Sequence, residues 1–556
     1  MAFRLNLVMV ICLVGTSIGD SFNLASAAPQ DKWTVVVQDA GVEAMHMTTF
    51  YTDKVAIFDR TNLPSNTTIL LPNGRCRDNP QDLVSKHDCY AHSVEYDSIT
   101  NSIRALFVFS DVFCSSGAFL PDGTLQQTGG DKEGERTIRK LGPGPNDDWV
   151  ETSNYLFVRR WYATNQILPD GTIIVIGGNN NPSYEFVPKK GTAAIPLQIL
   201  KDAYRGKPEG ENNMYPFVHL LPTGNLFIFS NIYSIIFNYK TNTVVKKLPD
   251  FGPDPRVYPY SGTSTLLPLS AANKFSTAII FICGGSTLGA YGGTKGAWTI
   301  SAATRALDTC GRIDVTAATP KWSVEKMPGP RVMVDGMILP TGEILYVNGM
   351  QYGLSGWNTA RNPELTPWLY NPTTKVFTKQ TPTTIIRPYH SSANVQSDGT
   401  VLIAGGNNQS PYTFTGVMFP TELRIEKYYP YYLNAAYDSV RYTLDPAIGV
   451  PTAGIKWNTN FKVKFRYPPY PTPPTKVQVS VYAPSFTTHA NSMNQRMLIL
   501  QQVGNITYGG KGTWDVWVTA PPNGNVAPPG YYMLTALNTA TTPPIPSAAK
   551  WVKFTP

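Results

Sequence analysis

The sequence is poor in charge and has no apolar run long enough to cross a membrane. Charged residues make up 15% of its 556 residues, against an average of about 25% in soluble proteins. The longest apolar stretch, from Leu5 to Val14, is far shorter than the roughly 18 residues that a membrane-spanning helix needs. There is also no run of basic residues and no nucleic-acid motif. We therefore expect no membrane span and no nucleic-acid partner, and we interpret the net charge of +8 as a solvated surface.

The apolar stretch near the start has the layout of a secretory signal peptide. Arg4 precedes it, and the small residues Ala25-Ser26-Ala27 follow it as a cleavage site would. We expect residues 1–27 to be removed and the mature protein to be secreted, reaching the cell wall or apoplast if the source is a plant. Three acceptor motifs for N-linked glycans agree with a secreted glycoprotein. They begin at Asn66, Asn408 and Asn505.

Cysteine is scarce, and its number is odd once the signal peptide is removed. Of the 6 cysteines, Cys12 leaves with residues 1–27, so an odd set remains in an oxidising compartment. The pairings closest in sequence are Cys76 with Cys89 and Cys283 with Cys310. These pairings leave Cys114 as the unpaired thiol.

Proline, glycine and aromatic residues are abundant instead. The chain has 47 Pro and 45 Gly, and aromatic residues make up 12% of it. This composition favours many short strands joined by tight turns over long helices. The length also exceeds the roughly 250 to 300 residues at which a single core stops growing. We predict an all-β chain with more than one domain.

A turn followed by a short strand recurs along much of the chain, and four of these strands end in Gly-Gly, at residues 129–130, 177–178, 284–285 and 405–406. The copies are the strands after Thr52-Asp53, Asp122-Gly123, Asp170-Gly171, Thr223-Gly224, Thr341-Gly342 and Asp398-Gly399, together with the strand from Ala278 to Gly285. Their spacing of roughly 45 to 70 residues suits four-stranded blades. We predict a seven-bladed kelch-type β-propeller over residues 28–437, because a closed ring removes edge strands. An unrelated β-sandwich with ordinary turns is the alternative, and the fifth copy is the least regular, since Pro268-Leu269-Ser270 replaces its turn.

The repeat stops after Tyr428, and a different pattern follows. Proline-rich stretches alternate there with strands such as residues 477–481. This pattern and a length of roughly 110 to 120 residues predict a C-terminal immunoglobulin-like β-sandwich over residues 438–556. His489 lies in this part of the chain, in a loop that must reach the propeller axis to meet the residues of the blades.

Three chemically distinctive residues share one place in the repeat. Cys114, Tyr162 and His390 each precede the glycine of their turn by the same interval, about nine residues. Equivalent positions in successive blades lie at the same height around the axis, so we expect these side chains to meet at one mouth of the channel. Tyr215 shares the interval and either lines that mouth or is a core aromatic residue. No partner pattern identifies a role for the remaining histidines, which are His46, His87, His92 and His219.

The motifs around these positions resemble those of the copper-radical oxidases, specifically the glyoxal oxidase branch of the galactose oxidase superfamily. They are Phe113-Cys114-Ser115, Arg160-Trp161-Tyr162, Pro388-Tyr389-His390 and Thr488-His489, and the likeness runs from about Trp33 to the C-terminus. The resemblance implies one copper ion bound by Tyr162, Tyr389, His390 and His489. It also implies a radical cofactor made by a thioether bond between Cys114 and Tyr162. Imidazole and phenolate ligands of this kind suit Cu(II).

The same resemblance implies an oxidase that converts aldehydes, through their hydrates, to carboxylic acids and reduces O2 to H2O2. In the implied mechanism Tyr389 is the general base, and the Tyr162 radical abstracts a hydrogen atom. One alternative is oxidation of primary alcohols, including the 6-hydroxyl of galactose in wall polysaccharide, and another is a non-catalytic kelch module that binds glycans or proteins. We expect a monomer, with a small aldehyde or primary alcohol and O2 as its partners and cell-wall polysaccharide as a further candidate.

One departure from the family pattern concerns the shielding of the modified tyrosine. Galactose oxidase covers this ring with a tryptophan, whereas the matching stretch, residues 179–184, contains none. Trp161 is a candidate for this role, although neighbouring side chains on a regular strand point in opposite directions.

Overall fold

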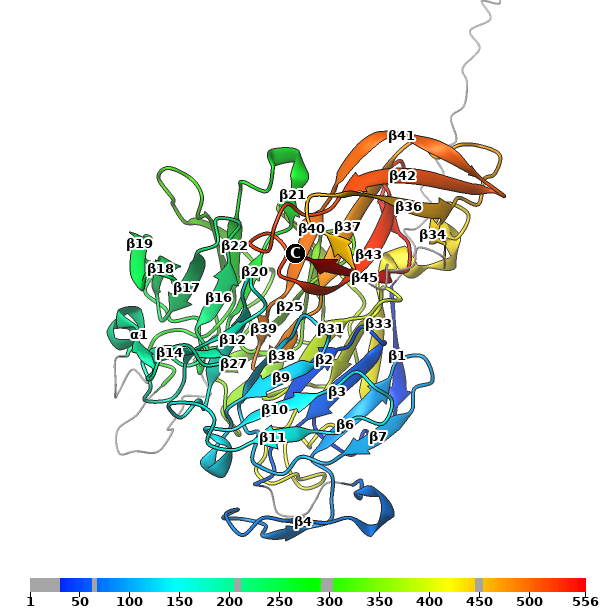
Figure 1. Cartoon of the computed structure of the whole chain (residues 1–556). Coiled ribbons are helices and arrows are strands. Elements are labelled where there is room, and N and C mark those ends of the chain that lie inside the picture. The colour runs from blue at the N-terminus through cyan, green and yellow to red at the C-terminus, as the bar shows by residue number, and fades with distance from the viewer. Residues whose placement is uncertain (1–30, 63–67, 205–211, 292–303, 446–453) are drawn as a thin grey trace, which may run out of the picture.

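The computed structural model describes residues 31–62, 68–204, 212–291, 304–445 and 454–556, and this part of the chain is almost entirely β-structure (Figure 1). The described residues contain one α-helix, α1 (Gln198–Ala203), and a few short 3-10 helices. The prediction of an all-β chain is therefore confirmed. No helix among the described residues is long and apolar enough to cross a bilayer. The predicted signal peptide, residues 1–27, lies outside the described residues.

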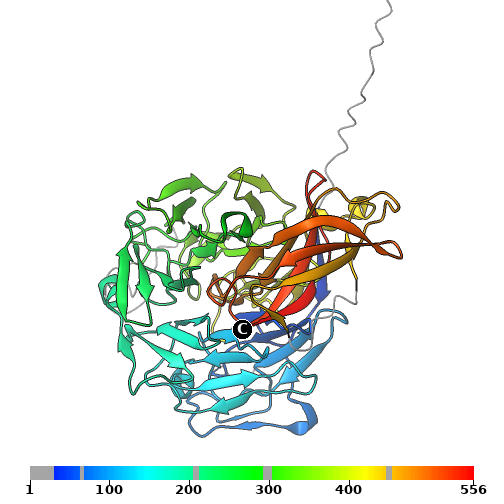
Figure 2. The same ribbon diagram turned by 45° about the horizontal axis from the view of Figure 1, so that its top comes forward.

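Before Tyr431, the described chain folds into seven sheets that each contain four consecutively paired antiparallel strands. In Figure 2 these sheets follow one another around the molecule in chain order, from blue through cyan and green to yellow. The first sheet contains β2 (His46–Thr49), β3 (Lys54–Phe58), β6 (Ser93–Asp97) and β7 (Ile103–Leu106), the second contains β8 (Ser116–Phe119), β9 (Leu125–Thr128), β10 (Ile138–Leu141) and β11 (Val150–Thr152), and the third contains β12 (Ala163–Ile167), β13 (Ile173–Gly177), β14 (Ser183–Val187) and β15 (Ile195–Pro196). The fourth sheet contains β16 (Phe217–Leu220), β17 (Leu226–Ser230), β18 (Tyr233–Asn238) and β19 (Thr243–Lys247), and the fifth contains β20 (Thr263–Leu266), β22 (Ile279–Cys283), β23 (Thr309–Asp314) and β24 (Ser323–Lys326). The sixth sheet contains β25 (Asp335–Ile338), β26 (Ile344–Val347), β29 (Trp368–Asn371) and β30 (Val376–Lys379), and the seventh contains β31 (Ser392–Val395), β32 (Val401–Ala404), β33 (Ile425–Tyr429) and β1 (Lys32–Val37). Two small hairpins lie outside these sheets, β4 (Arg77–Asp78) with β5 (His87–Asp88) and β27 (Met350–Gly353) with β28 (Ala360–Pro363).

The last of the seven sheets joins the two ends of this region. Strand β1 pairs with β33 in antiparallel fashion, with Lys32 opposite Tyr429. The sheet is thus completed by a strand that precedes all the others in the chain. This pairing holds the N-terminal segment to the segment that leads into the C-terminal module.

Glycine permits close packing where the first strands of neighbouring sheets approach each other. The Gly-Gly pair at the end of β9 has positive φ angles, 75° at Gly129 and 141° at Gly130. A Cβ atom on Gly130 would lie 2.0 Å from the carbonyl oxygen of Asp111. Any larger residue would therefore displace the loop that carries Cys114.

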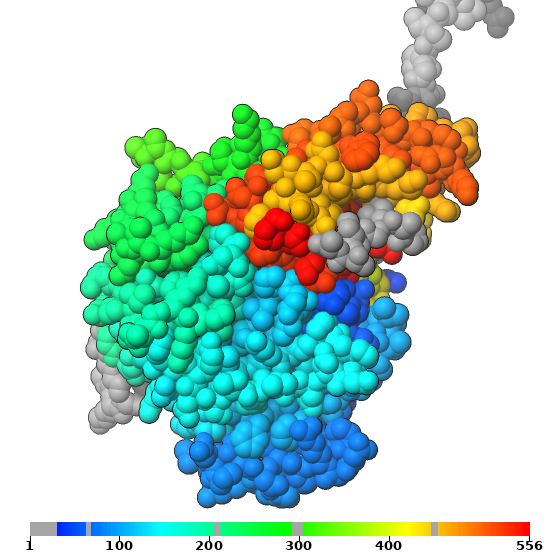
Figure 3. Space-filling model, in the orientation of Figure 1, coloured from blue at the N-terminus to red at the C-terminus, as the bar shows by residue number. Residues whose placement is uncertain are grey.

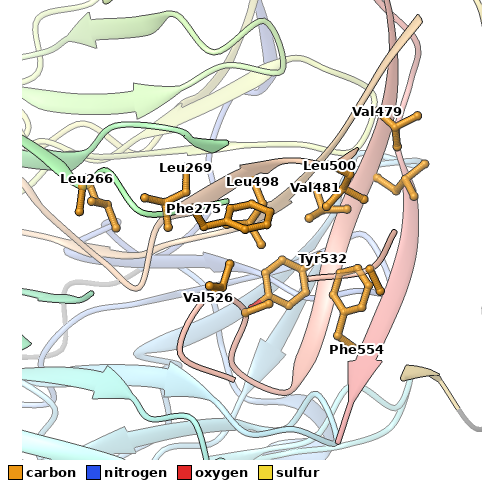
Figure 4. Packing of buried hydrophobic residues seen from close by; sticks show 14 of the residues in the cluster. Leu266, Leu269, Phe275, Val479, Val481, Leu498, Leu500, Val526, Tyr532 and Phe554 are labelled. Atoms are coloured by element: carbon orange, nitrogen blue, oxygen red, sulfur yellow. The ribbon is translucent and has the colours of Figure 1, made fainter. Parts of the chain in front are cut away.

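The fifth sheet differs from the others at the turn that the sequence pattern could not identify. The segment between β20 and β22 is extended there and forms the short strand β21 (Leu269–Ser270). Strand β21 pairs in parallel with β40 (Arg496–Ile499) of the C-terminal module. Leu269 and Phe275 are buried together with Leu498 in the same hydrophobic cluster (Figure 4). The irregular turn is thus a docking element.

The C-terminal module contains two sheets that pack over one hydrophobic cluster. The first sheet has the order β21-β40-β37-β43-β45-β35, and the second has the order β34-β36-β42-β41. Val463 and Val516 of the second sheet share this cluster with Val481 and Leu534 of the first. The strands that have not yet been placed are β34 (Thr443–Leu444), β35 (Ile455–Lys456), β36 (Asn460–Arg466), β37 (Val477–Ala483), β41 (Gln501–Gly510), β42 (Thr513–Thr519), β43 (Gly530–Asn538), β44 (Ile545–Pro546) and β45 (Lys550–Thr555).

A hairpin from this module extends away from it and enters the first of the seven sheets. It consists of β38 (Phe486–Thr488) and β39 (Asn491–Met493), and β38 pairs with β2 so that Thr488 lies opposite His46. The ring of Phe486 fits beside Gly117, where a Cβ atom would come within 2.5 Å of it. The expected loop around His489 is therefore the tip of a hairpin anchored by strand pairing. This hairpin is called the finger below.

Candidate metal centre

The residues that share the repeat interval also share an unusual backbone conformation. Each lies just before the first strand of its sheet, and the φ angle is 52° at Cys114, 63° at Tyr162 and 46° at Tyr215. Residues other than glycine rarely adopt this left-handed region, and such conformations often occur at functional sites. His390 and His489 also have positive φ angles, 137° and 51°.

Backbone hydrogen bonds link these positions from one sheet to the next. The backbone N–H of Tyr162 donates to the carbonyl of Cys114 at 2.9 Å, and the N–H of Tyr215 donates to the carbonyl of Tyr162 at 2.9 Å. The left-handed backbone conformation directs each of these N–H groups toward the preceding sheet. The shared interval in the sequence thus corresponds to a shared position in space.

The side chains of the predicted site residues converge on the tip of the finger. His390 Nε2 lies 2.9 Å from His489 Nε2, Cys114 Sγ lies 3.3 Å from the same atom, and the Tyr389 hydroxyl lies 3.4 Å from it. Tyr162 is in edge contact with the His489 ring, with 5.8 Å between the ring centroids. None of these five side chains is more than 6% exposed. The structure brings together all five residues that the sequence singled out.

Neighbouring hydroxyl groups orient the histidine at the centre. Thr488 Oγ1 lies 2.6 Å from His489 Nδ1, which leaves Nε2 directed at the other donor atoms. Such a partner on the remote nitrogen fixes the ring of a metal-binding histidine. Ser115 makes a similar contact with His46, whose Nε2 lies 3.2 Å from the hydroxyl. His46 thereby holds the loop next to Cys114 and is not itself one of the converging groups.

Burial determines the protonation of the cluster. It lowers the pKa of His390 and of His489 well below the usual range, and a positive charge on His489 would lower that of His390 further, as one on His46 would for His489. Burial also raises the pKa of Tyr162 and of Tyr389 well above the usual range. Both imidazoles are therefore neutral and able to donate a lone pair, and the phenols ionise only beside a cation. Two nitrogen and two phenolic oxygen donors form a set that suits Cu(II).

The thiol of Cys114 lies beside Tyr162. Burial raises its pKa well above the usual range, and the neighbouring Tyr162 hydroxyl partly offsets this effect. Cys114 is the free cysteine of the described chain, and it is buried. The two predicted disulfides, Cys76 with Cys89 and Cys283 with Cys310, are both present and thus confirmed.

A cavity of about 460 Å³ opens onto the two tyrosines of the centre. Its lining is Arg60, Asn62, Phe113, Asp131, Trp161, Tyr162, Tyr258, Ser355, Gly356, Trp357, Thr359, Tyr389 and Ser410. The Arg60 guanidinium lies 4.7 Å from the ring centre of Trp357 and 5.1 Å from that of Phe113. It also donates a hydrogen bond of 2.6 Å to the hydroxyl of Ser410. A cation in contact with two aromatic rings is thus fixed in the wall of the cavity.

Tyr258 belongs to this centre, and the sequence did not reveal it. Its ring stacks on that of Tyr162, with a centroid separation of 4.5 Å and an interplanar angle of 26°. Its hydroxyl lies 3.1 Å from the Tyr162 hydroxyl and 2.9 Å from the Tyr389 hydroxyl. Tyr258 precedes the fifth sheet, where the turn signature is missing. There is therefore no turn glycine from which the repeat interval to Tyr258 could be counted.

Trp161, the sequence candidate for shielding, also contacts the Tyr162 ring. The ring centroids are 4.7 Å apart and the planes are tilted by 44°. These two residues lie in a turn and not in a strand, so that neighbouring side chains can approach each other. Tyr162 thus has an aromatic neighbour in both Trp161 and Tyr258, and Tyr258 is the more nearly parallel of the two.

Tyr215 is a buried structural residue and does not line the cavity. It is 1% exposed, and its hydroxyl donates to the carbonyl oxygen of Ser115 at 2.8 Å. Of the two alternatives for Tyr215, the core aromatic residue is the one observed, and its ring packs against His489 with a centroid separation of 5.1 Å. The remaining histidines pair elsewhere: His219 with Ser264, His92 with Asp88, and His87 with Asp78.

Comparison with known proteins identifies matching families over most of the chain. Residues 45–432 match the family model described as glyoxal oxidase N-terminus, and residues 446–554 match the galactose oxidase-like early set domain. Aldehyde oxidase GLOX of Vitis pseudoreticulata is 40% identical over 97% of this chain and 99% of that protein. Aldehyde oxidase GLOX1 of Arabidopsis thaliana is 39% identical over 94% of this chain and 84% of that protein.

A solved structure gives the same answer about the fold. It is described as a novel fungal alcohol oxidase of the AA5 family in complex with copper, and it superimposes with a TM-score of 0.70 over 95% of this chain and 100% of its own. At 20% sequence identity this likeness shows a shared fold. From the family match and from relatives of this identity and coverage, the chain belongs to the glyoxal oxidase family of galactose oxidase-like proteins.

Proposed function

We propose that the protein is a secreted copper-radical oxidase that converts aldehydes, through their hydrates, to carboxylic acids and reduces O2 to H2O2. The observation that carries this proposal is the convergence of Tyr389, His390 and Cys114 on His489, next to a cavity that Tyr389 itself lines. The names of the relatives agree with it, since two that match nearly the whole chain are aldehyde oxidases.

In this proposal Tyr162, Tyr389, His390 and His489 would hold the copper ion. Copper bound there supplies a one-electron acceptor and a Lewis acid that holds the substrate oxygen. The Cys114 thiol forms a thioether with the ring of Tyr162, and each partner loses one hydrogen atom. Oxygen takes up the two electrons and two protons released. The electron-donating sulfur makes the Tyr162 phenol easier to oxidise to a stable radical.

In each turnover, the two electrons removed from the aldehyde hydrate go to two different acceptors. Tyr389 accepts the proton of a hydroxyl group of the aldehyde hydrate at its phenolic oxygen. The Tyr162 radical takes the hydrogen atom from the carbon that carries both hydroxyl groups. That atom contributes one electron and one proton, and bound copper would supply the acceptor for the second electron. Oxygen finally receives two electrons and two protons and leaves as H2O2, while the carboxylic acid is released.

The cavity supports a small substrate with several oxygen atoms. Arg60 offers a positive charge in its wall, and the indole N–H groups of Trp161 and Trp357 have no hydrogen-bond partner among the described residues. Each can donate to an oxygen acceptor. The burial of the Tyr162 ring between Trp161 and Tyr258 protects a radical from solvent. A hydrate, with two hydroxyl groups on one carbon, can use more of these donors than a simple alcohol.

The finer architecture is part of the same proposal. Residues 28–437 would form a seven-bladed β-propeller, and residues 438–556 would form an immunoglobulin-like β-sandwich that supplies a copper ligand. Contacts between the first strands of neighbouring sheets support a closed ring. Examples are Ser116 Oγ to Asn165 Oδ1 at 2.9 Å and Thr164 Oγ1 to the Pro216 carbonyl at 2.7 Å. Secretion, a monomeric state and a wall-polysaccharide partner stay predictions.

Peroxide release tests the proposal. Copper-loaded, oxidant-activated protein is screened against small aldehydes, primary alcohols and galactosides, with metal content measured on the same samples. We expect about one copper per chain and faster peroxide release with aldehydes than with alcohols. Preference for galactosides would replace the aldehyde assignment with the alcohol alternative. A protein that retains no copper and releases no peroxide would favour a binding module.

A further inference from the structure

The net charge of the protein is concentrated in the C-terminal module. Residues 438–556 contain ten Lys and Arg against three Asp and no Glu, which gives +7 of the total of +8. Residues 1–437, by far the larger part, are therefore nearly neutral, at +1. A charge asymmetry of this size between two parts of one chain indicates an acidic partner for the charged part.

A row of cations lies along one strand of this module. In β36, Val463 and Phe465 point into the hydrophobic cluster, and the alternating residues Lys462, Lys464 and Arg466 point outward. Strand geometry places successive members of the row roughly 7 Å apart. Lys511 is exposed in the turn between β41 and β42, at the end of the sheet where Arg466 pairs with Thr513.

An exposed aromatic ring lies in the middle of this sheet. Trp517 of β42 lies opposite Lys462 on one side and opposite Val503 of β41 on the other, so that all three share a face. Trp517 is 45% exposed and Val503 is 37% exposed. A large ring left open to solvent beside an apolar neighbour is typical of a binding surface. We call Lys462, Lys464, Arg466, Trp517 and Val503 the basic face.

The charges of the basic face are only partly neutralised. Asp515 is the only acidic residue of its four strands, and it contacts Lys462 at 3.2 Å and Lys464 at 3.8 Å. No ion pair of Arg466 is present among the described residues. Asp515 thus holds two lysines in place and cancels one of their charges. A net positive charge is left beside the tryptophan.

The basic face is directed away from the metal centre. The turns after the first strands of the ring sheets contact the C-terminal module; for example, a Cβ atom on Gly123 would lie 3.1 Å from Tyr531. The metal-centre residues lie at the opposite ends of these strands. In Figures 1 and 3 the sheet formed by β36, β42 and β41 lies at the outer end of the module, beyond the ring. A partner bound there leaves the cavity open to substrate.

We propose that the basic face binds an acidic polysaccharide, that is, a chain of uronate sugars. Carboxylates of successive sugars would contact Lys462, Lys464 and Arg466, and the apolar face of one sugar ring would lie on Trp517 and Val503. An anionic membrane is a poorer match, because membrane-binding clusters contain about four to eight basic residues. A nucleic acid is a poorer match too, since a single exposed ring offers little base stacking.

The test measures binding of the full-length protein to polygalacturonate, with neutral galactan as the comparison polymer. The triple variant Lys462→Gln/Lys464→Gln/Arg466→Gln should weaken binding at least about tenfold, which corresponds to about 1.4 kcal/mol. The control triple, Lys247→Gln/Lys326→Gln/Lys379→Gln, removes the same charge from exposed positions on the ring sheets. It should change binding less than about twofold if local contacts and not overall charge are responsible.

Trp517→Ala separates the proposed contact from a purely ionic one. It should lose the part of binding that survives added salt, because salt screens the charges and not the ring contact. Peroxide release should be unchanged in all these variants, which separates failure of this proposal from failure of the catalytic one.

Asn505→Gln, which removes the N-glycan acceptor site in the bulge of β41, should leave binding to polygalacturonate equal or stronger. Equal loss in both triple variants would overturn the proposal, as would equal binding to galactan or tighter binding to anionic lipid vesicles.

Discussion

The ring sheets and the finger bring residues to the same centre by different means. Cys114, Tyr162 and His390 occupy one position of a repeated sheet, and backbone hydrogen bonds link Cys114 to Tyr162 and Tyr162 to Tyr215, the next copy of that position. His489 comes from another module and reaches the centre because β38 adds itself to β2. Repetition can therefore place several groups at once, whereas a group from outside the repeat needs a docking surface of its own. In this protein the fifth sheet and β2 provide that surface.

Removing the imidazole of the finger should have the largest effect. We expect His489→Ala to lose copper and to lower peroxide release at least about a thousandfold, since three of the other groups lie around its Nε2 atom. Metal analysis and a peroxide assay measure the two effects. His87→Ala is the control, because that histidine is exposed and pairs with Asp78. Full copper content in His489→Ala would mean that the ring residues form the site alone.

Cys114→Ser tests a residue that the repeat places. We expect copper to stay bound and turnover to fall at least about a hundredfold, because the change removes the cross-link and no ligand. Mass spectrometry of the peptides that contain Cys114 and Tyr162 reports the link directly. Wild-type protein kept free of oxygen, in which the link cannot form, should show unlinked peptides in this measurement, as the variant does. Wild-type rates in Cys114→Ser would reject the thioether.

Leu269→Ala tests the docking of the C-terminal module. Leu269 is buried beside Leu498, so its truncation should lower the free energy of unfolding by about 2 to 4 kcal/mol. If the finger depends on this docking, copper should also dissociate more readily. Denaturant melts and competition with a chelator measure the two quantities. Leu288→Ala, at a position that is 44% exposed, should change neither, and unaltered copper affinity in Leu269→Ala would show that pairing with β2 holds the finger by itself.

Tyr258→Phe should have the smallest effect of the four. The change keeps the stacked ring and removes the hydroxyl group between Tyr162 and Tyr389, so we expect turnover to fall by about tenfold or less. Tyr258→Leu, which also removes the ring, should shorten the lifetime of the radical absorbance as well. If both variants shorten it equally, the hydroxyl group and not the stacking protects the radical.

The centre was predictable from sequence wherever the repeat is regular. The interval to the turn glycine placed Cys114, Tyr162 and His390 together, and the odd number of cysteines singled out Cys114 as the free thiol. The sequence did not reveal Tyr258 as a neighbour of Tyr162, because β21 replaces the turn from which the interval would have been counted. The same interval left two alternatives for Tyr215, because it gave the height along the axis but could not tell whether the ring faces the cavity or packs against His489.

By itself the sequence determined the strand-rich composition, the positions of the turns, the disulfide pairs and the chemical types at the centre, because these depend on local patterns and on counting. Only the tertiary structure decided which aromatic ring stacks on Tyr162, how the finger enters the first sheet, and that the cations of one strand surround an exposed tryptophan. Those features depend on contacts between segments distant in the chain. Their geometry follows from packing and strand pairing, which no interval in the sequence records.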